Sequence, residues 1–123
     1  MNPVLVLNVD DYEAGRYAKT RLLQNAGFDV HEAGSGMEAL RMAAATQPIL
    51  MLLDVRLPDI DGREVCRRIK ADAGTRAVHV VHISSAFITP EDVASGLESG
   101  AAAYITSPFE PRELIATLRS LIH

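Results

Sequence analysis

Three acidic residues stand at the ends of apolar segments and together could bind a metal ion. Asp10 and Asp11 follow an apolar run at residues 4–9, and Asp54 ends another at 49–54. If both runs are parallel strands, their carboxyl ends meet at one edge of a sheet, where ligands bind. Grouped carboxylates repel one another unless a cation lies among them, and hard oxygen ligands favour Mg2+. The pattern predicts a magnesium site; the alternative is that Asp10 and Asp11 cap a helix and Asp54 is a loop acid.

The segments that would position these acids alternate between two periodicities. Short apolar runs typical of buried strands occur at residues 4–9, 28–33, 49–54, 78–83 and 102–106. Between them, apolar residues recur every three or four positions, as expected for helices with one face against a sheet. This alternation predicts an α/β fold in which five helices cover both faces of a doubly wound, five-stranded parallel sheet.

Composition limits the function classes. A chain of 123 residues with 48% hydrophobic content is the size of one compact domain, which we expect to span residues 1–123. The net charge of −4 provides no basic surface for nucleic acid or an anionic membrane. No apolar run approaches the roughly 20 residues that span a bilayer, and no signal peptide is evident. Cys66, the one cysteine, has no partner for an internal disulfide. We therefore expect a cytoplasmic domain.

Several short motifs, in order, indicate a family. The block "LLDVRLPDIDG" at residues 52–62 places a proline and a glycine in a tight loop after Asp54. The acidic pair in "VDD" at 9–11, a hydroxyl residue ending the fourth run and "YITSPF" at 104–109 complete the set. Over essentially its whole length the chain resembles a response regulator receiver domain of two-component signalling. The resemblance implies a flavodoxin-like strand order, 2-1-3-4-5.

The resemblance also implies roles for the acids. Asp54 would be the phosphoacceptor, modified by a sensor histidine kinase or a histidine phosphotransfer protein. Asp11 and Asp54 would bind Mg2+ through their side chains, Arg56 through its backbone carbonyl, and Asp10 through water. These roles describe a signalling switch in a phosphorelay, not an enzyme.

The same resemblance implies two switch residues. Ser84 would be the hydroxyl that turns toward the phosphoryl group, at the separation from Asp54 that the family shows. Ser85 is the alternative, because Ala86 follows it as alanine follows the hydroxyl in the family. Tyr104 would be the aromatic residue that moves with the hydroxyl, although such a tyrosine can also be an ordinary half-buried strand residue.

One position departs from the family pattern. Ser107 stands where the family has a lysine directly before a proline, and the Ser107-Pro108 bond is expected to be cis by resemblance. A hydrogen bond with a charged group contributes roughly 1.5–3 kcal/mol against about 1 for a neutral one, so the replacement weakens the site. Lys19 and Lys70 lie in helical segments that we expect to be away from the strand ends, and neither is expected to replace the lysine. The Arg56 side chain is the nearer candidate, although such a residue is most often solvated.

The leading hypothesis is a phosphoacceptor that signals by repacking the surface around its fourth helix, fifth strand and fifth helix. Residues 85–122 resemble receivers attached to hybrid sensor histidine kinases, so other domains of a larger kinase are expected partners. A weak homodimer through the face between the fourth and fifth helices is a further expectation, from mixed charges at Glu91, Asp92, Arg112 and Arg119.

Two rival hypotheses remain open. A degenerate receiver would use the fold as a docking or regulatory module independent of phosphorylation, because the lysine is missing at Ser107. A small Mg2+-dependent hydrolase would use Asp54 as its nucleophile. Such a hydrolase would carry a second acid two residues later, where Arg56 stands.

Overall fold

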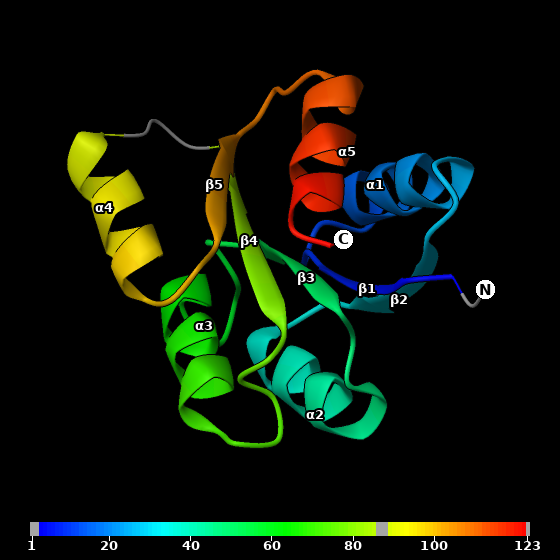
Figure 1. Ribbon diagram of the computed structural model, residues 1–123. Coiled ribbons are helices and arrows are strands. Elements are labelled where there is room, and N and C mark those ends of the chain that lie inside the picture. Colours follow the sequence, from blue (N-terminus) through cyan, green and yellow to red (C-terminus); the bar gives the residue numbers. More distant parts are fainter. Residues whose placement is uncertain (1–2, 86–88, 123) are drawn as a thin grey trace.

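Five strand–helix units form the domain, and the computed structural model describes residues 3–85 and 89–122. In chain order they are β1 (Leu5–Val9) and α1 (Glu13–Asn25), β2 (Asp29–Ala33) and α2 (Gly36–Thr46), β3 (Leu50–Asp54) and α3 (Gly62–Ala71), β4 (His79–Ser84) and α4 (Pro90–Glu98), and β5 (Ala103–Thr106) and α5 (Pro111–Ser120). The strands make one parallel sheet in the order β2-β1-β3-β4-β5 (Figure 1). The predicted fold class and strand order are confirmed.

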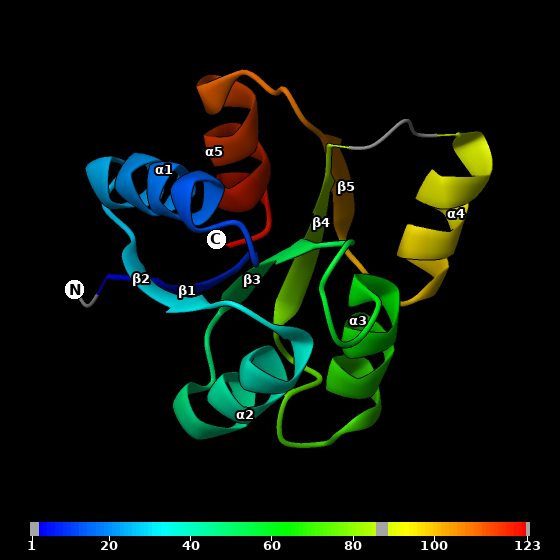
Figure 2. The same cartoon turned by 180° about the vertical axis from the view of Figure 1, so that it is seen from behind.

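Helices cover both faces of the sheet, which explains why β1 and β3 are nearly continuous apolar runs. Helices α1 and α5 lie on one face and α2 and α3 on the other, as the two opposite views show (Figures 1 and 2). Val6 and Leu52 belong to the core under α1 and α5, whereas Leu7 and Leu53 belong to the core under α2 and α3. Successive apolar residues of these strands therefore pack into one core or the other.

The strand register carries the acidic residues to one edge. Val9 at the end of β1 pairs with Leu53, the residue before Asp54. The chain passes from β1 to β2 on one side and later enters β3 on the other, so the strand order reverses between β1 and β3. Asp10, Asp11 and Asp54 follow these two strands and lie at the switch point, where ligands of such sheets bind.

The predicted strands begin one residue too early in all five cases. At two of them, Phe28 and Val78, the residue is buried in the core although the strand begins at the next residue, so its apolar character reports burial and not strand pairing. The reason does not extend to Ile49 and Ala102, which are exposed. The fourth strand also ends one residue later than predicted, at Ser84.

The helices are short. The longest, α1, has 13 residues, and no helix within residues 3–85 and 89–122 is long and apolar enough to cross a membrane.

Candidate functional site

The predicted acidic cluster is present at the carboxyl edge of β1 and β3. Asp10, Asp11 and Asp54 each place a carboxylate oxygen within 4.8 Å of the others. Asp10 is buried, Asp54 half-buried and Asp11 exposed. A set of hard oxygen donors with one side open to water matches what Mg2+ requires. The prediction that the three acids lie together is confirmed.

Asp54 is held by the backbone that follows it. Its Oδ1 accepts a hydrogen bond of 2.9 Å from the Arg56 amide. Burial raises the pKa of Asp54, and the neighbouring charges of Asp10 and Asp11 raise it further, against the lowering effects of the Arg56 amide and of Lys19. A cation bound among the three acids would favour the ionised form of Asp54, so the donor set fits a metal ion in charge as well as in ligand type.

The turn from β3 to α3 is closely packed behind Asp54. The Gly62 amide donates to the Val55 carbonyl at 2.8 Å, and the Val55 amide donates to the Ile83 carbonyl at 3.1 Å. A Cβ atom on Gly62 would lie 2.3 Å from the Asp54 carbonyl oxygen. Only glycine fits this approach, so the glycine fixes the backbone that carries Asp54.

Lys19 lies within the acidic cluster, contrary to the sequence-based prediction. Its Nζ is 2.9 Å from Asp10 Oδ2, and the two side chains are only 10% and 8% exposed. Side chains of a helix lean toward its N-terminus, and α1 begins just after the acidic pair, so the long lysine side chain reaches back to the end of β1. The prediction is correct for Lys70, which donates to the Arg76 and Val78 carbonyls before β4.

A cavity of about 430 Å³ opens beside the cluster. Asp10, Lys19, Asp54, Ser85 and Ser107 are among its lining residues. Ser107, at the position of the missing lysine, and Lys19 therefore line the same cavity.

The bond between Ser107 and Pro108, which follows β5, is cis, as predicted. The Ser107 amide donates to the Ser84 carbonyl at 2.8 Å and so ties this turn to the end of β4. The cis bond that the resemblance implies is thus present, although serine stands in place of the lysine before the proline.

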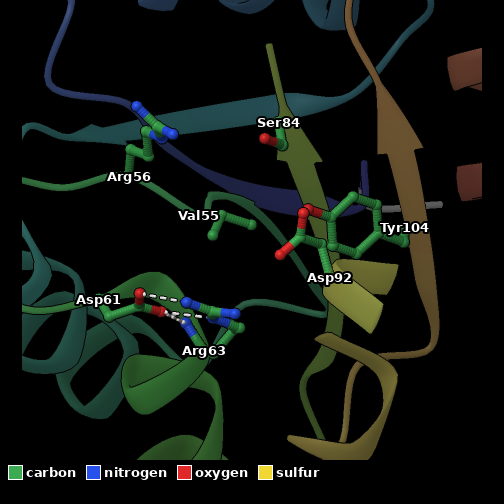
Figure 3. Close-up of a pocket in the computed structure, with 7 residues that line it drawn as sticks. All are labelled: Val55, Arg56, Asp61, Arg63, Ser84, Asp92 and Tyr104. Atoms are coloured by element: carbon green, nitrogen blue, oxygen red, sulfur yellow. Dashed lines mark hydrogen bonds and ion pairs between the residues drawn. The ribbon is translucent and has the colours of Figure 1, made fainter. Parts of the chain in front are cut away.

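A second cavity, of about 290 Å³, contains the predicted aromatic switch. Figure 3 shows Tyr104 of β5, Ser84 at the end of β4 and Arg56 of the loop after β3 around this space. The Tyr104 ring packs on Gly96 of α4, where a Cβ atom would come within 2.6 Å of the ring. Tyr104 is therefore in direct contact with α4.

The two serines after Ile83 line different cavities. Ser84 is 5% exposed and lines the Tyr104 cavity, whereas Ser85 is exposed and lines the Asp54 cavity. Ala86, on which the alternative rests, lies outside the described residues. The choice of Ser84 as the hydroxyl switch stays a prediction.

The Arg56 side chain, the expected substitute for the lysine, is exposed and lines the Tyr104 cavity. Its contact with Asp54 is made by its backbone amide. The exposed Arg56 side chain fits the solvated alternative, and its substitution for the lysine stays a prediction.

Comparison with known proteins identifies the family. The family model of the response regulator receiver domain matches residues 6–119 of the sequence. The chain is 41% identical over 115 residues to the DNA-binding response regulator MtrA of Mycolicibacterium paratuberculosis, covering 94% of this chain and 49% of MtrA. The chain thus spans about half the length of this curated relative.

Solved structures agree. The chemotaxis protein CheY4 of Vibrio cholerae superposes with a TM-score of 0.90 at 27% identity, covering 98% of this chain and all of the other. The receiver domain of a signal transduction histidine kinase from Syntrophus aciditrophicus gives 0.88 at 28% identity, covering 97% and 89%. The family therefore occurs both in DNA-binding regulators and in kinases. The chain belongs to the response regulator receiver domain family of two-component systems.

Proposed function

We propose that Asp54 accepts a phosphoryl group from a phosphohistidine of a sensor histidine kinase or a histidine phosphotransfer protein. The observation that carries the proposal is a half-buried carboxylate at the end of β3, grouped with two other acids and open to a cavity. An Asp54 oxygen attacks the phosphorus, and the phosphorus–nitrogen bond breaks. The electron pair stays with the imidazole, which takes up a proton. The product is an acyl phosphate on Asp54.

Mg2+ is the proposed cofactor, with Asp11 and Asp54 as side-chain ligands and the Arg56 carbonyl as a third. Both oxygens of Asp10 already accept hydrogen bonds, from the Tyr12 amide at 2.9 Å and from Lys19. This supports contact of Asp10 with the ion through water. Bound Mg2+ would neutralise negative charge on the phosphoryl group during transfer.

The protein itself positions the Asp54 carboxylate. The Arg56 amide orients one Asp54 oxygen, and the packed turn at Gly62 prevents the end of β3 from shifting. Such positioning is the main contribution that a protein makes to phosphoryl transfer, because a misplacement of about 1 Å can cost about 100-fold in rate.

The proposed output runs through Tyr104. Ser84 would turn toward the phosphoryl group and Tyr104 would follow, and the contact of its ring with Gly96 supports a change in the packing of α4. In this proposal residues 1–123 form one receiver domain that signals through protein contacts and acts as a switch, not as an enzyme. Other domains of a longer chain, including those of a hybrid kinase, are candidate partners.

Contact with nucleic acid by this chain itself is not expected from its charge. That absence stays a prediction, since the relative MtrA is a DNA-binding regulator about twice as long.

Three of the charges invoked for a homodimer lie at different places in the fold. Arg112 and Arg119 line a groove between α1 and α5, and Arg119 donates to the carbonyl of Ala26, just after α1, at 3.1 Å. Asp92 forms the capping box of α4 with Thr89. The expected weak dimer through the face between α4 and α5 stays a prediction, without support from these charges.

The first test is phosphorylation by a small donor. Incubation with acetyl phosphate and Mg2+ is expected to add the mass of one phosphoryl group, measured on the intact protein. Chelation of the metal with EDTA is expected to slow the addition by at least about tenfold, because the acids then stay uncompensated. No addition with any donor would contradict the proposal and favour a docking module. Donor consumption without an adduct would favour a hydrolase.

A further inference from the structure

Lys19 is a charged residue in an unusual position. It lies on the side of α1 that packs on the sheet, one helical turn before the fully buried Leu23. Its own side chain is 90% buried. Removing a lysine and an aspartate from water has an electrostatic cost that their mutual attraction often does not exceed, and apolar residues frequently serve stability as well. Stability alone therefore gives no reason for an ammonium group here.

Lys19 lines the cavity beside the proposed phosphoacceptor. Lys19, Asp54 and Ser107 line the same cavity, and the charge of Lys19 lowers the pKa of Asp54, opposing the effect of burial. The Lys19 ammonium is thus close enough to interact with the Asp54 carboxylate, and it could balance the charge of a phosphoryl group there. The cavity also contains the side chain that stands in place of the family lysine.

Other cations within residues 3–85 and 89–122 are directed elsewhere. Arg16 donates to the Asp10 carbonyl at 2.8 Å and pairs with Glu32 at 3.2 Å. The Arg56 side chain lines the other cavity, and Lys70 bonds to carbonyls before β4. Lys19 is the one lysine or arginine of this part of the chain that lines the Asp54 cavity.

We propose that Lys19 supplies, from α1, the cation that binds the phosphoryl group on Asp54, in place of the lysine that Ser107 replaces. The inference rests on the proposed function and adds to it the residue that contacts the transferred group. An ammonium has three N–H donors. Lys19 can therefore keep its bond to Asp10 while a second N–H donates to a phosphoryl oxygen.

The test measures binding of beryllium fluoride, which mimics the phosphoryl group on a carboxylate, and of Mg2+ alone. Isothermal titration calorimetry is carried out on Lys19→Met, which keeps the length of the side chain and removes its charge. The expected loss of beryllium fluoride affinity, at saturating Mg2+, is about ten- to 150-fold, the range for a hydrogen bond to a charged group. Mg2+ affinity alone is expected to stay equal or to rise, because a positive charge beside the ion is removed.

Two further variants sharpen the result. Adding Ser107→Lys to Lys19→Met is expected to recover most of the lost beryllium fluoride affinity, because a cation returns to the same cavity from the other side. Lys70→Met is the matched control and is expected to bind beryllium fluoride as the unchanged protein does. Thermal unfolding with Mg2+ checks that each variant is folded. If Lys19→Met is not, it is replaced by Lys19→Gln, whose neutral amide keeps hydrogen-bond donors on the side facing Asp10.

The outcomes distinguish the role of Lys19 from the phosphorylation of Asp54. Unchanged beryllium fluoride affinity in Lys19→Met would overturn the role of Lys19 and leave phosphorylation of Asp54 intact. Equal losses of Mg2+ and beryllium fluoride affinity without recovery by Ser107→Lys would show that Lys19 only supports Asp10, and would also overturn it. Failure of the unchanged protein to bind beryllium fluoride would overturn the proposed function and this inference with it.

Discussion

Replacement of Asp54 by asparagine is expected to abolish phosphoryl incorporation from acetyl phosphate while the domain stays folded. The amide oxygen carries no negative charge and forms no acyl phosphate, but it can still accept the hydrogen bond of the Arg56 amide. The folded state raises the pKa of Asp54, so the ionised carboxylate destabilises the fold at neutral pH. Asp54→Asn should therefore be at least as stable as the unchanged protein at pH 7.

The measurement is a time course of intact mass with Mg2+ present. Asp59→Asn is the control, since Asp59 is an exposed acid of the same loop whose oxygens accept bonds from the Gly36 and Met37 amides. Incorporation should continue in this variant. Persistent incorporation in Asp54→Asn would show that another residue is the acceptor.

The second large effect is expected from Gly62→Ala, which should destabilise the domain by about 3 kcal/mol, the upper range for overpacking. The new Cβ would lie 2.3 Å from the Asp54 carbonyl oxygen and 2.8 Å from the Val55 Cα. Both are backbone atoms, so no side-chain rotation relieves the contact, and the end of β3 must move. Phosphoryl incorporation should fall by about 100-fold, because Asp54 moves with that backbone.

Urea unfolding measures the loss of stability, with Gly74→Ala as the control. A Cβ on Gly74 would meet its nearest neighbour, Asp72 Oδ1, at an ordinary 3.5 Å. Its effect should stay within about 0.5 kcal/mol. If Gly62→Ala retained both stability and incorporation, the turn after β3 would not be what positions Asp54.

Much of the fold could be predicted from the sequence, because the hydrophobic pattern follows directly from which residues are buried. Strands β1 and β3 are buried on both faces and therefore read as apolar runs, and parallel topology brings the ends of such strands together. The convergence of Asp10, Asp11 and Asp54 could thus be predicted without coordinates. The starts of β2 and β4 could not, because Phe28 and Val78 are buried without belonging to a strand.

The role of α1 in the site was missed for a different reason. The position of Lys19 in a helix says where its Cα lies but not where a long side chain places its amine. A signal was available, since Lys19 precedes Leu22 and Leu23 by three and four residues and so shares their face of α1. A lysine on the apolar face of a helix that starts beside an acidic pair is a candidate for that site.

The division of Ser84 and Ser85 between two cavities was beyond the sequence as well. It depends on the residue at which β4 ends, and a shift of one residue reverses which side chain faces which space. Both serines follow the same apolar run, and local pattern does not distinguish them.

The most direct test of phosphoryl acceptance at Asp54 is a crystal structure of the domain with Mg2+ and beryllium fluoride. We expect beryllium bonded to an Asp54 carboxylate oxygen, with Lys19 Nζ at hydrogen-bond distance from a fluoride. An anion bound at another residue, or a cavity that stays empty at saturating beryllium fluoride, would contradict the assignment of Asp54 as the phosphoacceptor.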